Sequence, residues 1–233
     1  MVVIDASSIV KSTPEAGHET STRCGFRDFR FEDGYFRLNG KRVFLKSAHF
    51  GGDSPMTGII PFDPGMVRRD FLELKLMGFN MARCIAGLAR RYVVDLADEI
   101  GLMVYDESYA AWCVTPSPKM PERWSRCTAG MIRRDRNHPS VVMWGLLNET
   151  SNGPVFVHAV ESLKLVKSLD DTRVVMLNSG RFDNQLSEAP QDPAAAGRAV
   201  LPEAWVVGRG FQVPFVACNR SGADIDNDGT VFP

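Results

Sequence analysis

The sequence predicts an α/β fold in which a parallel sheet is built from about five strand–helix units. Five short apolar runs alternate with segments whose apolar residues recur at helical spacing, which is the pattern of βα units. Proline and glycine mark several of the expected helix ends. With 233 residues, 44% of them hydrophobic, and a net charge of -1, the chain is long enough for one large globular domain.

The five strands are expected in the apolar runs. They lie near residues 43–48, 80–84, 102–105, 141–146 and 174–177. Four helices separate them, opening at Pro64, near Tyr92, near Glu122 and at Pro154. The first helix has Asp63 as its N-cap and proline at the first helical position. Gly78 and Gly101 end the first two helices.

The most informative motif is the pair Asn148 and Glu149, which follows the apolar run 141–147. A strand that buries this run places the Glu149 carboxyl at its C-terminal end, where barrel enzymes hold their catalytic groups. Glu149 is therefore the first candidate for a catalytic acid. An Asn-Glu pair alone usually marks a solvated loop, so its context decides.

That context is residues 131–149, which closely resemble the acid/base segment of glycoside hydrolase family 2, the β-galactosidase, β-glucuronidase and β-mannosidase family. Segments 36–46, 77–83, 98–107 and 174–179 resemble the same family's catalytic barrel, in the same order. The resemblance implies a partial (β/α)8 TIM barrel of about five βα units. It also implies that residues 20–32 are the last strand of an immunoglobulin-like β-sandwich preceding the barrel.

The resemblance divides the chain into three expected parts. Residues 1–34 would end the sandwich domain and its linker, residues 35–184 would form the N-terminal part of the barrel, and residues 185–233 would be a divergent tail. A complete barrel needs about 250 residues, so the chain is expected to be truncated. In the tail, residues 224–229 have the start of a calcium loop without its closing Glu, so a solvated acidic turn is the default.

The family implies hydrolysis of terminal β-linked sugars by a retaining double displacement, with Glu149 as acid/base and Asn148 bonded to the sugar 2-hydroxyl. The family's attacking Glu ends the seventh strand, which is not recognisable here. The chain is therefore expected to be an inactive fragment that lacks the nucleophile. Two alternatives stay open, a non-catalytic half-barrel that binds carbohydrate or is a remnant, and a chimera with an unrelated tail.

Three further candidates for substrate binding lie at expected strand ends. Arg83 matches a family arginine near the catalytic carboxylates, with a structural ion pair as the alternative. Asp106, like Glu107, contacts either sugar hydroxyls or Arg83 and the basic residues 133–136. His49 either faces the pocket or is a hydrogen-bonded structural residue. Residues 49–52 and 84–87 depart from the family's usual pocket sequences, so the sugar cannot be inferred.

The expected partner is a carbohydrate, and no metal or cofactor is predicted. Near-neutral charge argues against nucleic acid and membrane surfaces, and no apolar run is long enough to span a bilayer. Five scattered cysteines indicate reduced thiols. The compartment stays unknown, with the cytoplasm favoured because no signal peptide is visible. Exposed edges of an incomplete barrel favour a homo-oligomer.

Overall fold

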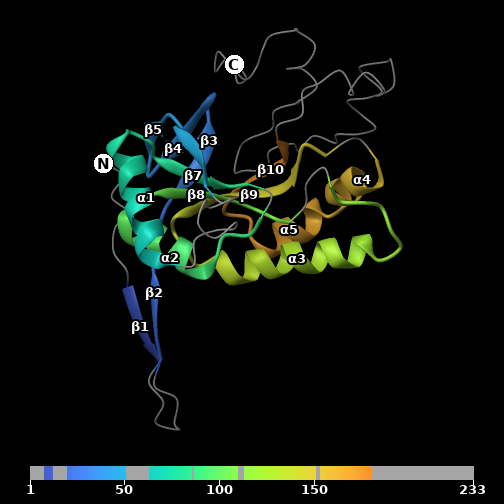
Figure 1. Cartoon of the computed structure of the whole chain (residues 1–233), viewed down its shortest axis with the longest axis horizontal. Helices are drawn as coiled ribbons and strands as arrows, with labels where there is room; N and C mark the ends of the chain where they lie inside the picture. The colour runs from blue at the N-terminus through green and yellow to red at the C-terminus, as the bar shows by residue number, and fades with distance from the viewer. Residues whose placement is uncertain are drawn as a thin grey trace.

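The computed structural model describes residues 8–12, 20–50, 63–85, 87–109, 113–150 and 153–179, with the backbone alone for 8–12 and 20–24. Five parallel strands form the main sheet in the order β10-β9-β8-β7-β6 (Figure 1). They are β6 (Ser47–Phe50), β7 (Met81–Cys84), β8 (Met103–Glu107), β9 (Val141–Asn148) and β10 (Val174–Ser179). Because neighbours in the sheet are also neighbours in sequence, the prediction of successive βα units is confirmed.

Helices connect these strands at the predicted places. They are α1 (Pro64–Leu76), α2 (Arg91–Ile100), α3 (Met120–Asp135), α4 (Pro154–Glu161) and α5 (Leu163–Leu169). The Asp63 side chain accepts a hydrogen bond from the Gly65 amide at 2.8 Å and caps α1. Gly101, with φ 73°, ends α2 in the left-handed conformation that glycine adopts without strain. The last predicted helix is two helices, divided at Ser162.

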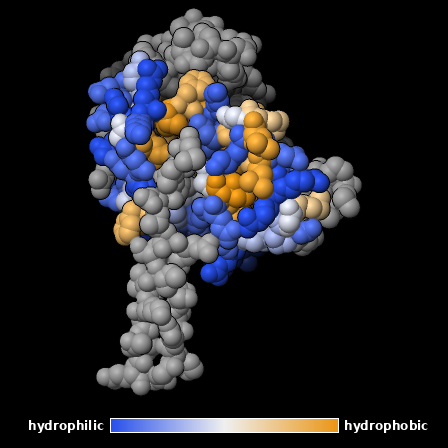
Figure 2. Space-filling view, turned by 90° about the vertical axis from the view of Figure 1, so that its left-hand side faces the viewer, coloured by the Kyte–Doolittle hydropathy of each residue, from blue (hydrophilic) through white to orange (hydrophobic). Residues whose placement is uncertain are grey.

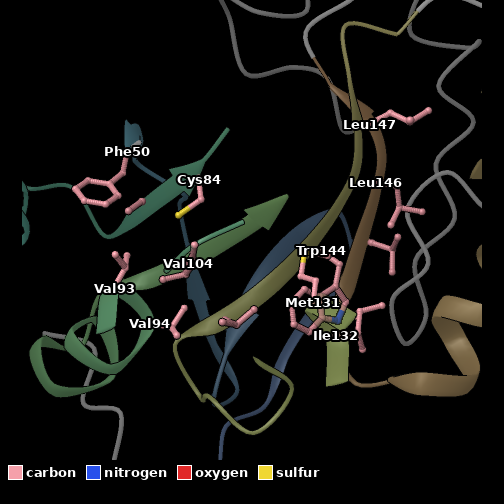
Figure 3. Packing of buried hydrophobic residues seen from close by; sticks show 14 of the residues in the cluster. Phe50, Cys84, Val93, Val94, Val104, Met131, Ile132, Trp144, Leu146 and Leu147 are labelled. Carbon is pink, nitrogen blue, oxygen red and sulfur yellow. The ribbon is translucent and has the colours of Figure 1, made fainter. Parts of the chain in front are cut away.

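Two hydrophobic clusters cover the two faces of the sheet, because successive side chains of a strand point to opposite faces. On the helix side, Trp144 and Leu146 of β9 belong to one cluster with Val93 of α2 and Ile132 of α3 (Figure 3). The opposite face holds the second cluster, in which Met103 and Tyr105 of β8 take part. The main sheet is therefore buried on both sides over much of its length.

A three-stranded antiparallel sheet packs on the face opposite the helices (Figure 1). It consists of β3 (Phe29–Glu32), β4 (Tyr35–Leu38) and β5 (Lys41–Val43). Phe29, Phe31 and Leu38 join the second cluster. Figure 1 also shows a separate antiparallel pair, β1 (Ser8–Ser12) and β2 (Thr20–Cys24).

Two predicted strands had the wrong bounds. The first strand of the main sheet is β6, whereas residue 43 belongs to β5. Residues 20–32 are divided between β2 and β3, which lie in different sheets, and β3 packs on the barrel sheet. Asp33–Gly34 and Asn39–Gly40 all have positive φ and form hairpin turns that join β3, β4 and β5, which explains why residue 43 ends this small sheet. That residues 20–32 end an immunoglobulin-like sandwich stays a prediction.

The surface of the described residues is mixed in polarity. On the face shown in Figure 2, hydrophobic residues form separate patches bordered by hydrophilic ones. Large exposed hydrophobic side chains include Leu72, Leu76 and Met77 at the end of α1. Across the described ranges, no helix is both long and apolar enough to cross a membrane. The tail predictions, including residues 224–229, lie outside the described residues.

Candidate functional site

Four polar side chains meet at the C-terminal ends of four adjacent strands, and we call Arg83, Glu107, Asn148 and Ser179 the rim cluster. Arg83 Nε donates to Glu107 Oε1 at 2.7 Å. Arg83 Nη2 donates to Asn148 Oδ1 at 2.7 Å and to Ser179 Oγ at 2.5 Å. The residues come from β7, β8, β9 and β10 respectively. Parallel strands bring their C-terminal ends to one edge, so a single guanidinium can bind all three partners.

Glu107 is the buried charge of the rim cluster. Its side chain is only 1% exposed, and a carboxylate so removed from water needs a nearby cation, which Arg83 supplies. Space for it comes from Gly145, its register partner on β9. A Cβ added at Gly145 would lie 2.3 Å from Glu107 Cγ and 2.7 Å from Tyr105 Cε2. Glycine is therefore required at this position for Glu107 and Tyr105 to lie against β9.

Tyr105 lies beside Glu107 and keeps its proton. Burial raises the pKa of the Tyr105 phenol well above its usual range, and the charge of Glu107 adds to this rise, while Arg83 opposes it. The guanidinium carbon of Arg83 lies 5.2 Å from the centre of the Tyr105 ring, within range of a cation–π contact. Tyr105 therefore supplies a neutral ring and hydroxyl beside the Arg83–Glu107 pair.

The Asn148 amide has a defined orientation. A guanidinium only donates hydrogen bonds, so the oxygen Oδ1 must face Arg83, and the Ser179 hydroxyl also donates to it at 3.1 Å. The nitrogen Nδ2 then faces the other way. It is buried, and none of the described residues accepts a hydrogen bond from it. Since buried donors are normally paired, Asn148 presents an N–H group to an acceptor from outside the rim cluster.

Glu149 follows Asn148 in an uncommon backbone conformation. Its φ is +49°, in the left-handed region, which costs a residue other than glycine on the order of 1–3 kcal/mol. The Glu149 amide donates to the Ser179 carbonyl at 2.7 Å. The next residue, Thr150, exchanges two hydrogen bonds with the Asn178 side chain, at 3.2 and 3.0 Å. β10 thus holds a sharp turn that leaves the Glu149 side chain exposed at the strand end.

The other two candidates, His49 and Asp106, are not part of the rim cluster. His49 is the register partner of Arg83 and is exposed, so it lies on the same edge of the sheet. Asp106 is fully buried and does not join the rim cluster. Its Oδ1 accepts a hydrogen bond from the Ala89 amide at 2.8 Å, on the helix side of β8. Of the two uses expected for Asp106 and Glu107, the ion pair with Arg83 is the one found for Glu107.

Sequence reasoning missed Ser179 and Gly145 as parts of the site. A glycine inside an apolar strand often marks the close approach of another group, and this signal was present at Gly145. Strict alternation along β8 also separates Asp106 from Glu107, because adjacent strand residues face opposite sides. In the portion of the chain described here, no group of three or more His, Cys, Asp or Glu residues is arranged to hold a metal ion.

Comparison with known proteins places these features in a family. Residues 29–195 match the family model described as glycosyl hydrolases family 2, TIM barrel domain. A β-glucuronidase structure from Parabacteroides merdae shares 29% identity with a TM-score of 0.63, over 71% of this chain and 22% of that one. A Bacteroides uniformis β-glucuronidase shares 28% identity with a TM-score of 0.64, over 73% of this chain and 22% of that one.

A third similar structure is a family 2 β-galacturonidase from Eisenbergiella tayi bound to galacturonate. It shares 29% identity with a TM-score of 0.65, and the match covers 72% of this chain and 31% of that one. The chain therefore spans between 22% and 31% of the length of these three relatives.

Proposed function

Because the chain belongs to glycosyl hydrolases family 2, we propose that it carries the catalytic acid of a retaining β-glycosidase that hydrolyses terminal β-linked sugars. Glu149 protonates the leaving oxygen in the first step and deprotonates water in the second. The observation that supports this role is the rim cluster, which fixes Asn148 beside an exposed glutamate at the C-terminal edge of the sheet. Barrel enzymes hold their catalytic residues at this edge.

The proposed contacts with the sugar follow from the polarity of the rim cluster. The Asn148 N–H donates a hydrogen bond to the oxygen of the sugar 2-hydroxyl, and this bond strengthens in the transition state. Arg83 donates hydrogen bonds to Asn148 and Glu107 and thereby orients both side chains. The names of the similar structures, two β-glucuronidases and a β-galacturonidase, make β-glucuronides and β-galacturonides the first substrates to test.

A retaining mechanism also needs an attacking carboxylate about 5–5.5 Å from the acid. Within the rim cluster the one carboxyl is Glu107, and Arg83 binds it at 2.7 Å in a buried position. Glu107 is thus poorly suited to attack an anomeric carbon. We propose that the nucleophile is not among the described residues and that the chain alone does not turn over substrate. The second candidate function is carbohydrate binding without hydrolysis. The Asn148 N–H, which has no acceptor among the described residues, also supports it.

The test combines hydrolysis and binding on the full chain. Nitrophenyl and alkyl β-glucuronides, β-galacturonides, β-galactosides, β-glucosides and β-mannosides are assayed for hydrolysis. Binding of glucuronate and galacturonate is followed by NMR. Binding without hydrolysis, weakened at least tenfold by Asn148→Ala, supports a sugar site without a nucleophile. Absence of both binding and hydrolysis overturns the carbohydrate proposal.

Any observed hydrolysis would contradict the proposal that the chain alone does not turn over substrate. It would also allow the role of Glu149 to be tested directly. Glu149→Gln should then lower kcat/KM, which reports the first step, about 10²–10⁴-fold on alkyl glycosides, whose leaving groups need a proton, and much less on nitrophenyl glycosides. Glu161→Gln, at an exposed glutamate that ends α4, is the matched control and should leave both rates unchanged. Equal losses of kcat/KM on both classes of glycoside would rule out an acid role for Glu149.

A further inference from the structure

Two aspartates are buried together behind the rim cluster, on the helix side of the sheet. Asp106 of β8 and Asp135 of α3 are both 0% exposed, and hydrogen bonds through Ala89 and Arg134 link them. The charge of Asp135 raises the pKa of Asp106, so the two carboxyl groups are neighbours. Two neighbouring buried carboxylates repel each other where charge is poorly screened, and Arg134 can neutralise only one of them, so two negative charges on the pair are strongly disfavoured. One of the two groups must hold a proton.

The surrounding donors distinguish the two carboxyl groups. Arg134 donates to both oxygens of Asp135, from Nε at 2.7 Å and from Nη2 at 2.6 Å, which is the forked geometry of an ion pair. Asp106 accepts one hydrogen bond, from the Ala89 amide to Oδ1 at 2.8 Å. None of the described residues donates to Asp106 Oδ2. Asp135 is therefore the carboxyl group with the cationic partner, and Asp106 Oδ2 is the atom with room for a proton.

We propose that Asp106 is protonated in the folded protein at neutral pH and acts as a positioning residue, with its Oδ2–H donating to Asp135. This bond closes a ring of four groups. Asp106 accepts from the Ala89 amide, Arg134 Nη2 donates to the Ala89 carbonyl, Arg134 binds Asp135, and Asp135 accepts from Asp106. Both polar groups of Ala89 are thus held by the ring.

The ring joins the two strands that carry the buried ion pair of the rim cluster. Ala89 lies between β7 and α2, in the segment that follows Arg83, and Asp106 directly precedes Glu107. α3 supplies both Arg134 and Asp135. The backbone on either side of the Arg83–Glu107 pair is therefore attached to one rigid helix. Asp106 acts on the proposed sugar site through this attachment, without touching it.

The groups around Asp106 act on its proton in both directions, and the net effect favours the protonated form. Burial raises the pKa of Asp106 well above its usual range, and the charge of Asp135 raises it further, while the Ala89 amide and Arg134 oppose the rise. Cys84, the register partner of Asp106 on β7, is buried with a raised pKa and stays a neutral thiol. Tyr109 is a further titratable neighbour of Arg134.

The sign of the resulting pH dependence follows from the raised folded-state pKa. Unfolded Asp106 ionises near pH 3.9, about the value of a free aspartate, whereas the folded form keeps its proton to higher pH. The stabilising contribution is complete below pH 3.9 and is lost progressively as the pH rises towards the folded-state value. Asp106→Asn removes this loss, because an amide Nδ2 donates to Asp135 at every pH.

The experiment uses the full chain and two independent readouts. Infrared spectra of folded wild type at pH 7 should contain the C=O stretch of a carboxylic acid, shifted in D2O and absent in Asp106→Asn. Asp33→Asn is the matched control, because the Asp33 side chain is 82% exposed and asparagine tolerates its positive φ. The control should keep the band.

The second readout is the ratio of the folding equilibrium constants of Asp106→Asn and wild type, from urea unfolding between pH 4 and pH 8. The ratio should rise by up to about tenfold per pH unit until folded Asp106 ionises. A flat ratio, or a band that survives in Asp106→Asn, overturns the proposal. If that variant does not fold, carbon-13 spectra of aspartate-labelled wild type decide, since one carboxyl must stay protonated at pH 7. A spectrum in which all carboxyls are ionised overturns it as well.

Discussion

Glu107 is the residue on which the energetics of the rim cluster depend. Arg83→Ala removes the guanidinium that neutralises a carboxylate only 1% exposed, so we expect a loss of about 3–5 kcal/mol in the free energy of unfolding. Arg83→Ala combined with Glu107→Gln should recover part of that loss, because the buried charge is then gone. Urea denaturation measures both values.

The control for this prediction is Arg69→Ala. Arg69 pairs with Glu73 across one turn of α1, but its side chain is 66% exposed. Exposed pairs of this kind contribute about 0.5 kcal/mol or less. If Arg83→Ala is no more damaging than Arg69→Ala, the buried pair does not stabilise the fold and the argument from burial is wrong.

Gly145 allows a second prediction at the same scale, with a matched glycine elsewhere. Gly145→Ala places a Cβ 2.3 Å from Glu107 Cγ, so we expect a loss of about 1–3 kcal/mol from overpacking and displacement of Glu107. Gly130→Ala on α3 meets no atom within 4 Å and should stabilise the helix by up to about 1 kcal/mol. Thermal unfolding of both variants checks the opposite signs. Similar effects at the two sites would contradict the close packing at Gly145.

The residues of the site differed in how far a single sequence could identify them. Arg83, Asn148 and Glu149 lie at the ends of recognisable apolar runs, and the resemblance of these segments to glycoside hydrolase family 2 made them candidates. Ser179 forms equally direct contacts, yet a serine at a strand end gives no distinct signal. The left-handed backbone of Glu149 depends on bonds from β10, which is 25 or more residues away. Long-range contacts of this kind are not visible in local patterns.

Among the elements, α2 and the start of β9 are joined by an ionisable contact. His138 Nδ1 lies 2.7 Å from Asp98 Oδ2, and Asp98 Oδ1 accepts from the Ser140 amide at 2.9 Å. Burial lowers the pKa of His138, but its hydrogen bond to Asp98 and the charges of Asp98, Asp135 and Asp95 outweigh this effect. The net result is a raised pKa, so protonated His138 favours the folded state.

This contact predicts that stability falls at high pH. The contribution of His138 is complete below pH 6.5, about the value for an unfolded histidine, and is lost as the pH rises through the higher folded-state pKa. We expect His138→Gln to cost about 1.5–3 kcal/mol at pH 6, the range for a hydrogen bond to a charged group, and clearly less at pH 9. His49→Gln, at an exposed position, is the control. A cost independent of pH would refute the charged contact.

The elements themselves were predictable where periodicity and end signals agreed. Asp63, Pro64 and Gly101 marked helix ends that the structure keeps. The errors lay at residues 20–32, expected as one strand by resemblance but divided between β2 and β3, and at residues 43–48, where the strand of the main sheet begins only at Ser47. Asp33–Gly34 and Asn39–Gly40 are strong hairpin signals, and their weight should have exceeded that of the apolar run.

At the scale of the whole molecule, the order of strands predicts a gradient of stability across the main sheet. β8 lies in the centre, with all five of its residues buried, and pairs with β7 and β9. β6 and β10 each have one neighbour within the described part of this sheet, and two residues of β6 are exposed. Amides that open only with the whole domain exchange far more slowly than those released by local opening.

We therefore expect the amides of β8 and β9 to exchange slowest with deuterated solvent, and those of β6 and the outer side of β10 to exchange fastest. Hydrogen exchange followed by NMR or mass spectrometry measures the gradient. Equal protection of β6, β8 and β10 would mean that both edges are covered. Exposed edges also promote association, so an edge could be covered by a second copy of the chain or by other residues of the same chain. Sedimentation and hydrogen exchange over a range of protein concentrations distinguish these two cases. Protection that rises with concentration indicates a second copy, whereas protection independent of concentration indicates residues of the same chain beyond those described.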